Sequence, residues 1–240
     1  MSNALESAPM PPRQAAAPER RRDAERTRNE ILEVATRAFA AHGYAGARID
    51  DMAERMRTTK RMIYYYFGGK EQLYIAVLER AYITIRRAER QVDVDGLEPD
   101  AAVRRIAELT FDHHESHPEF IRLVSIENIH HAEHMRRSRA IAELGTPAID
   151  VLGRILERGR AEGLFRGDVD AVDVHMMISA FCVFRVANRH TFGTLFQRDL
   201  ADPALRHHYR RMVGDMIVAY LSPARAAQPS AARRDPAHGQ

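Results

Sequence analysis

The residues best placed to do chemistry lie in the run KRMIYYYF, residues 60–67. If this run is helical, Ile63 and Phe67 share one face because they are four positions apart. The opposite face then carries Lys60, Arg61, Tyr64 and Tyr65. Basic side chains hydrogen-bond guanine edges, while tyrosine offers a hydroxyl to phosphate and a ring to thymine methyl groups. The face suits a DNA major groove, although an ordinary amphipathic helix with solvated charges would show the same spacing.

The elements around this run fit a helix-turn-helix. Such a motif needs two short helices joined by a tight turn, and residues 47–66 meet this requirement. A short helix is predicted over residues 49–56, the turn RTT follows, and the second helix is predicted over residues 59–67. Gly68 and Gly69 end that helix.

Helical spacing of apolar residues continues along most of the chain, and we find no alternating pattern typical of strands. The first helix is predicted from Asp23, a good N-cap, to His42, with Gly43 as its stop. The other helices are predicted over residues 70–90, 99–116, 118–139, 146–162, 170–190 and 203–221. The predicted fold class is therefore all-α.

Composition limits the setting of the protein. Residues 1–22 and 222–240 are rich in Pro, Ala and Arg without periodicity, which predicts a disordered arm and tail. Residues 1–90 hold 17 Lys and Arg against 12 Asp and Glu, so the N-terminal part is the basic one. The single cysteine, Cys182, and the lack of a signal-peptide core or membrane-length apolar run predict a cytoplasmic protein without a membrane partner.

Two longer segments carry a family resemblance. TTKRMIYYYFGGKEQLYIAVL resembles the recognition helix of TetR-family bacterial regulators and its continuation, and RNEILEVATRAFAAHGYAGARIDDMAERM resembles their first two helices. The resemblance covers residues 24–84. Arg57 departs from it, standing where the family usually has a turn glycine, and so does Arg48, where threonine or serine is common. The exact geometry of the turn is therefore open.

The resemblance implies a homodimeric DNA-binding transcriptional regulator, a repressor that a small-molecule effector releases from a palindromic operator. It implies a three-helix DNA-binding domain over residues 23–69 and a helical effector-binding and dimerisation domain over residues 70–221. No cofactor and no catalytic residue are expected. Ile63 then belongs to the core. The DNA-binding residues that it implies are Arg48, Thr59, Lys60, Arg61, Tyr64, Tyr65, Tyr66 and Lys70.

Roles within that set also follow from the resemblance. Lys60, Arg61 and Tyr65 are expected to approach bases. Tyr64, Tyr66 and Lys70 are expected to hold phosphates, and Arg48 adds a further phosphate contact.

The C-terminal half contains two notable apolar segments. Residues 170–190 are apolar almost all round, which predicts burial on several sides, and residues 203–221 carry one apolar stripe. The resemblance implies that two such helices from each subunit form a four-helix dimer interface, and the alternative is a core within one chain. The predicted interface residues are Val183, Leu205, Tyr209, Met212, Val213, Met216, Ile217 and Tyr220.

A small, mainly apolar effector is expected among the C-terminal helices, where Met and aromatic side chains accompany a few polar groups. The predicted ligand-binding residues are Phe111, Phe120, Leu123, Val124, Glu127, His131, Met176 and Phe181.

Histidines raise the separate question of a metal. Glu127 and His131 are four residues apart, as are His130 and His134, and this spacing permits metal ligation or hydrogen bonding to an effector. We expect no metal, because solvated or core histidines are commoner; the candidates are Glu127, His131 and His175. The histidines at 113, 114, 117 and 175 could join these residues only if the fold brings them close.

Other classes of function stay open at this stage. A metal or a protein partner would be an alternative effector, and a helical adaptor is a further alternative. An enzyme is the competing class, but the sequence has no phosphate-binding glycine loop, nucleophile motif or dinucleotide fingerprint.

Overall fold

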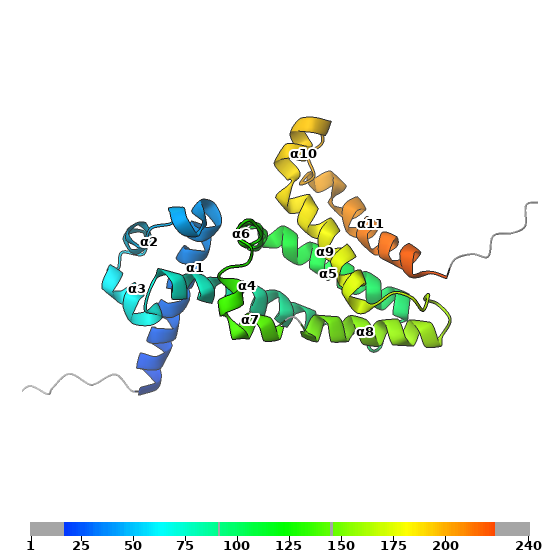
Figure 1. The fold of residues 1–240 in the computed structure, drawn as a ribbon, viewed down its shortest axis with the longest axis horizontal. Coiled ribbons are helices and arrows are strands. Elements are labelled where there is room, and N and C mark those ends of the chain that lie inside the picture. The colour runs from blue at the N-terminus through cyan, green and yellow to red at the C-terminus, as the bar shows by residue number, and fades with distance from the viewer. Residues whose placement is uncertain (1–16, 91, 145, 224–240) are drawn as a thin grey trace, which may run out of the picture. The chain divides into compact units, whose positions relative to one another are not determined.

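The chain is helical in every element of the computed structural model, which describes residues 17–90, 92–144 and 146–223 (Figure 1). It divides into two compact units, residues 1–77 and 78–240. Helix α4, Lys70–Arg90, begins in the first unit and ends in the second. The predicted all-α class is confirmed, and the first unit extends past the expected boundary at residue 69.

The first unit contains α1 (Ala17–Gly46), α2 (Ile49–Arg55), α3 (Lys60–Phe67) and the start of α4. Helix α1 begins before the expected Asp23, so the predicted arm is helical from Ala17 onward, while residues 1–16 lie outside the described part of the chain. Gly43 has φ 68° and kinks α1 where its end was predicted, and one further turn follows it.

An aromatic cluster forms the centre of this unit. Phe39 and Tyr74 are fully buried, and their ring centroids lie 4.8 Å apart in an edge-to-face arrangement. Tyr44 packs on Tyr74 at 5.3 Å. Ile63 and Phe67 of α3 are also buried, which confirms the predicted core face of that helix. These two anchors determine which side of α3 faces outward.

Arg57 resolves the geometry of the turn between α2 and α3. Its φ is 53°, in the left-handed region that glycine adopts at low cost. Its N–H donates to the Glu54 carbonyl and that of Thr58 donates to the Ala53 carbonyl, both at 3.0 Å. This pair of bonds is the Schellman motif. The arginine therefore keeps the backbone of a turn glycine, at a conformational cost.

In the second unit four helices surround one apolar core (Figure 1). They are α5 (Pro99–Ser116), α8 (Thr146–Ala161), α9 (Ala171–Ala187) and α11 (Pro203–Leu221). The shorter elements are α6 (Pro118–Ile129), the 3-10 helix η1 (Met135–Arg137), α7 (Arg139–Leu144) and α10 (Arg189–Phe196).

The prediction of one helix over residues 118–139 is wrong, because α6 stops at Ile129. His131 and Ala132 follow in left-handed conformations, with φ of 55° and 58°. The buried Glu127 carboxylate accepts the backbone N–H groups of His134 and Met135, at 3.2 and 3.1 Å. This side-chain bonding replaces the helical ladder and turns the chain.

The helix predicted over residues 170–190 also ends early. Helix α9 stops at Ala187, and α10 leaves it at an angle of 71°. Within the described residues, no single helix is long and apolar enough to cross a membrane, although α9 and α10 taken together pass that test of length and composition.

The Arg57 turn generates a first prediction. Arg57→Gly should raise the free energy of unfolding by about 1 kcal/mol, because glycine removes the left-handed strain at that position. Urea denaturation of the full chain measures this change. Arg57→Ala is the matched control, since it removes the side chain and keeps the strain. Equal stability of the two variants would contradict the backbone explanation.

Candidate functional site

Helix α3 presents a polar and aromatic face to solvent. Tyr65 is 79% exposed and Tyr64 is 48% exposed, and Lys60 and Arg61 are exposed beside them. Because Ile63 lies on the opposite side with none of its surface exposed, the predicted facing of the helix is confirmed. The exposed face combines cations, phenol hydroxyls and rings, which are the groups that read base edges and hold phosphates.

The basic residues around α3 are held by short-range contacts. Lys60 forms an ion pair with Asp50 of α2, and the Arg48 guanidinium lies 3.9 Å from the same carboxylate. These side chains are substantially exposed, so the pairs are weak and a phosphate can compete for the cations. Asp50 therefore brings two of the predicted DNA-binding residues to one place.

Lys70 lies at the start of α4. Its Nζ donates to the Ala45 carbonyl at 3.3 Å and lies 4.9 Å from the centre of the Tyr44 ring. Partial burial lowers the pKa of Lys70. Tyr66 is half-buried, with its ring 5.3 Å from that of Tyr65. Thr59 is exposed and extended at the N-cap of α3. All eight predicted DNA-binding residues thus lie in the first unit.

The predicted ligand-binding residues are scattered in the second unit. Phe111 belongs to the main core, whereas Phe120 packs in a separate cluster with Ile121. Met176 is 61% exposed and His131 is exposed, and the others of the set, Leu123, Val124, Glu127 and Phe181, are buried or half-buried. The structure therefore divides side chains that were expected to share one site, with Phe111 and Phe181 in the main core and Phe120 and Val124 in the separate cluster.

An internal cavity instead lies among α4, α5, α8 and α9. Its volume of about 10 Å³ is enough for one water molecule. The residues that line it are Glu89, Ile106, Thr110, Val151, Leu152, His175 and Ile178.

A buried ion pair borders this cavity. Arg86 Nη1 donates to both carboxylate oxygens of Glu89, at 2.8 and 2.6 Å, and the two side chains are only 11% and 6% exposed. Burial raises the pKa of Glu89 even though Arg86 opposes the rise. The same Nη1 lies 3.4 Å from His175 Nε2, and His175 Nδ1 lies 3.3 Å from the Ser179 hydroxyl. One guanidinium thus links two residues of the cavity wall.

Buried histidines of α5 lie close to this pair. Burial, together with neighbouring positive charges, lowers the pKa of His113 to about 3 and that of His114 to about 4. The His113 ring stacks on that of His117 at 4.2 Å. Electrostatic coupling extends from His114 to His175 and Arg86. The fold therefore places these four histidines near one another and near Arg86, and it keeps His113 and His114 neutral near pH 7.

The candidate metal ligands do not converge. The Glu127 carboxylate contacts the His134 ring at 3.1 Å, whereas His131, which the spacing would have permitted beside Glu127, is exposed. His175 lies instead beside Arg86. Among the residues that the structure describes, no group of three or more His, Cys, Asp or Glu side chains is arranged to hold a metal ion.

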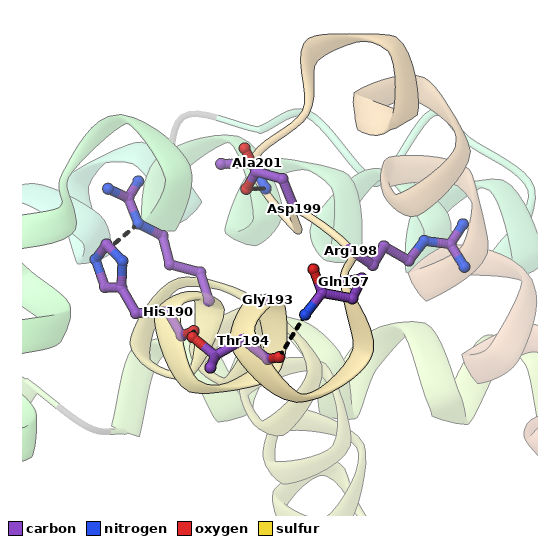
Figure 2. Close-up of a pocket in the computed structure, with 8 residues that line it drawn as sticks. His190, Gly193, Thr194, Gln197, Arg198, Asp199 and Ala201 are labelled. Carbon is purple, nitrogen blue, oxygen red and sulfur yellow. Dashed lines mark hydrogen bonds between the residues drawn. The ribbon is translucent and has the colours of Figure 1, made fainter.

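A larger pocket of about 590 Å³ opens on the surface at α10 and the loop that follows it (Figure 2). Its polar side chains are bonded to their chain neighbours: Arg189 to His190, Gln197 to the Thr194 carbonyl, and Asp199 to the N–H of Ala201. Because these groups are satisfied locally or exposed to water, the surface pocket has less binding potential than the buried cluster around Arg86.

The predicted dimer residues fall into three groups. Tyr209, Val213 and Ile217 are buried in the core of their own chain, and Leu205 and Val183 pack partly against neighbouring helices. These three side chains are therefore covered by their own chain. The other members of the set, Met212, Met216 and Tyr220, are 36%, 41% and 39% exposed.

Sequence reasoning missed Arg86, Glu89 and Thr110. A signal existed for Glu89, because the buried stripe of α4 passes through Leu78 and Ile85 and reaches position 89 at the same helical spacing. A charged residue on an inward stripe indicates a partner inside the protein.

Comparisons with known proteins agree with this architecture. Residues 31–77 match the family of bacterial regulatory proteins called the tetR family, and residues 99–217 match the tetracyclin repressor-like C-terminal domain. The HTH-type transcriptional repressor NicS of Pseudomonas putida is 36% identical over 202 residues, which are 84% of this chain and 95% of that protein. The repressor SCO4008 of Streptomyces coelicolor is 38% identical over 108 residues, covering 45% and 53% of the two chains.

Solved structures show the same fold. The putative transcriptional regulator SCO4942 of Streptomyces coelicolor superposes with a TM-score of 0.60 at 29% identity, covering 79% of this chain and 97% of that one. The regulator FadR of Bacillus subtilis in complex with stearoyl-CoA has a TM-score of 0.60 at 18% identity, covering 80% and 98%.

The buried histidines predict how stability depends on pH. The pKa of His113 is about 3 in the folded chain and rises towards its ordinary value of 6.5 on unfolding. The unfolded state therefore binds more protons between these values, so stability is complete above pH 6.5 and falls as the pH falls. At pH 5 the loss attributable to His113 is about 2 kcal/mol.

Urea denaturation of the wild type and of His113→Phe at pH 7.5 and pH 5 tests this dependence. The variant should lose less stability on acidification, whereas His42→Gln, which changes an exposed histidine, should behave like the wild type. Identical losses in all three proteins would show that burial of His113 does not control the acid response.

Proposed function

Because this chain belongs to the TetR family of bacterial regulatory proteins, we propose that it is a transcriptional repressor that binds operator DNA as a homodimer and releases it when a small effector binds. The observation that carries the proposal is the outward face of α3, where Lys60, Arg61 and Tyr65 stand on a helix anchored by buried Ile63. Residues 31–77, which match the family, include this helix.

Roles on the DNA follow from position. Arg61 and Tyr65 lie on the exposed face of α3 and are proposed to read bases, together with Lys60. Arg48, Tyr64, Tyr66 and Lys70 are proposed to hold phosphates, with Thr59 at the N-cap. Phosphate contacts supply affinity for any DNA, and base contacts supply sequence preference.

A two-fold dimer would present two equivalent recognition helices to DNA. On α9, Val172, Met176 and Phe184 form an exposed apolar stripe at multiples of four residues. Met212, Met216 and Tyr220 form a second stripe on α11, which packs against α9. These two stripes are the proposed dimer face, because pairing with a second copy would remove both from water.

Effector control requires a state in which the recognition helices no longer match the DNA. Helix α4 is the proposed lever, because it begins with Lys70 in the first unit and carries Arg86 and Glu89 in the second. A coupling free energy of about 1.4 to 3 kcal/mol would change DNA affinity roughly 10- to 150-fold. Operator DNA must then weaken effector binding by the same factor.

We propose a cytoplasmic location, because a bacterial regulator must reach the chromosomal DNA that it controls. A gel-shift assay with the DNA upstream of the protein's own gene distinguishes this function from the alternatives. A repressor should bind that DNA specifically, whereas an enzyme or a helical adaptor should not.

Two variants separate base reading from phosphate binding. Lys70→Ala should weaken binding to all DNA sequences and lower the salt dependence of the affinity, whereas Arg61→Ala should also relax sequence preference. Gel shifts on operator and random DNA at several salt concentrations measure both effects. Arg122→Ala, an exposed change on α6, controls for lost charge. Equal losses on specific and random DNA for both variants would refute this division of roles.

A charge placed on the exposed stripe of α11 should disrupt the dimer. Met216→Glu should produce a monomer at micromolar concentration in sedimentation and weaken operator binding, because the glutamate would be buried against a second copy. Ile129→Glu is the matched control, since Ile129 is a 72% exposed apolar residue on α6. A dimer that survives Met216→Glu with full DNA affinity would place the interface elsewhere.

A further inference from the structure

The cluster around Arg86 has hydrogen-bonding capacity that neither DNA binding nor dimerisation uses. Glu89 takes both of its hydrogen bonds from a single nitrogen of Arg86, Nη1. The Nε of the same guanidinium is buried without a hydrogen-bond partner. A buried donor left unpaired is costly, so native proteins rarely keep one without a role.

His113 adds to this capacity. Both of its ring nitrogens are buried without a hydrogen-bond partner, and a neutral imidazole offers one donor and one acceptor. His113 and His114 belong to α5, which supplies Ile106 and Thr110 to the cavity wall. A cavity of about 10 Å³ admits one water molecule, too few to satisfy all of these groups.

The sign of the local charge distinguishes between classes of ligand. Burial lowers the pKa of His113, His114 and His175; Arg86 lowers the pKa of His175 next, and it adds to the effect of neighbouring histidines on His113 and His114. Arg86 Nη1 lies 3.4 Å from His175 Nε2, and it is Nη1 that Glu89 occupies, so the unpaired Nε is the part of the cation left for a ligand. A positive charge there attracts an anionic group and repels an ammonium group.

The rest of the cavity wall is apolar. Ile106 of α5, Val151 and Leu152 of α8 and Ile178 of α9 complete the lining. A ligand held here by one charged group would place an apolar body against these side chains.

We propose that the effector is a small carboxylate with an apolar body, whose carboxylate accepts hydrogen bonds from Arg86 Nε and from the neutral imidazoles beside it. This inference rests on the proposed function of an effector-controlled regulator. The guanidinium suits this task, because its N–H groups form a planar fork that matches a carboxylate.

Binding of such a molecule must enlarge the cavity. The walls come from α4, α5, α8 and α9, so an occupant larger than water has to push these helices or their side chains apart. Glu89 and the ligand would share one guanidinium, with Glu89 on Nη1 and the ligand on Nε. The ligand therefore acts directly on α4.

Calorimetry on the full-length protein without DNA tests the ligand class. The probes are benzoate, phenylacetate, hexanoate and decanoate, each compared with its primary amide, and benzylamine serves as the cation. At least one carboxylate should bind roughly 10- to 150-fold more tightly than its amide, because its hydrogen bonds are charge-assisted. Benzylamine should not bind.

Variants assign the recognition to Arg86. Arg86→Lys keeps a cation beside Glu89 but loses the fork, and the double variant Arg86→Met/Glu89→Leu replaces the buried pair with apolar side chains, a change that folded proteins often tolerate. Both should weaken carboxylate binding by roughly 10- to 150-fold. Arg185→Met is the matched control, because it removes another buried arginine and leaves Glu115 paired with Arg206.

Gel shifts on operator DNA distinguish a failure of the carboxylate inference from a failure of the proposed repressor function. The carboxylate inference is wrong if the protein binds its operator but every carboxylate binds no more tightly than its amide, or if benzylamine binds best. The proposed function as a regulator is unaffected by either result. Carboxylate affinity unchanged in Arg86→Lys would also overturn the carboxylate inference. A protein that does not bind operator DNA would refute the proposed function, whatever it does with carboxylates.

Discussion

A guanidinium buried among helices must keep a carboxylate beside it, and the second unit is organised around that requirement. Removing Arg86 from water is costly unless Glu89 stays within hydrogen-bonding distance, and the two side chains are three residues apart on one helix. Helices α5 and α9 then bring polar groups to the same place, since Thr110, His114 and His175 surround the pair. The interior is therefore polar around this pair, and Glu127 with His134 and Arg185 with Glu115 form separate buried polar contacts.

Burial of apolar side chains exposes polar groups in the first unit and encloses titratable groups in the second. In the first unit, burying Ile63 and Phe67 turns the charged and aromatic side chains of α3 outward, so a small apolar core displays a polar surface. In the second unit, apolar helices enclose titratable groups, and burial keeps His113 and His114 neutral. Helix α4 takes part in both, because it begins in the first unit and carries Arg86 and Glu89 in the second.

Two side chains explain why local sequence patterns do not predict the turn after α2 or the end of α6. Arg57 takes a left-handed conformation that glycine would adopt more easily, and the turn keeps its hydrogen bonds. Glu127 ends a helix that the apolar periodicity predicts to continue. Its carboxylate accepts hydrogen bonds from backbone N–H groups seven and eight residues further along the chain. An acidic side chain on the buried face of a helix can therefore end that helix by accepting backbone hydrogen bonds.

The sequence by itself determined the all-α class, the helix-turn-helix, the outward face of α3 and most helix ends, because these depend on spacing and on residues close in the chain. Only the tertiary structure decided which apolar residues of α11 face their own core: Val213 and Met216 look alike in a stripe, yet one is fully buried and the other 41% exposed. It also decided that Arg86, His175 and the histidines of α5 meet, because their contacts join positions far apart in the chain, and packing of whole helices sets such distances.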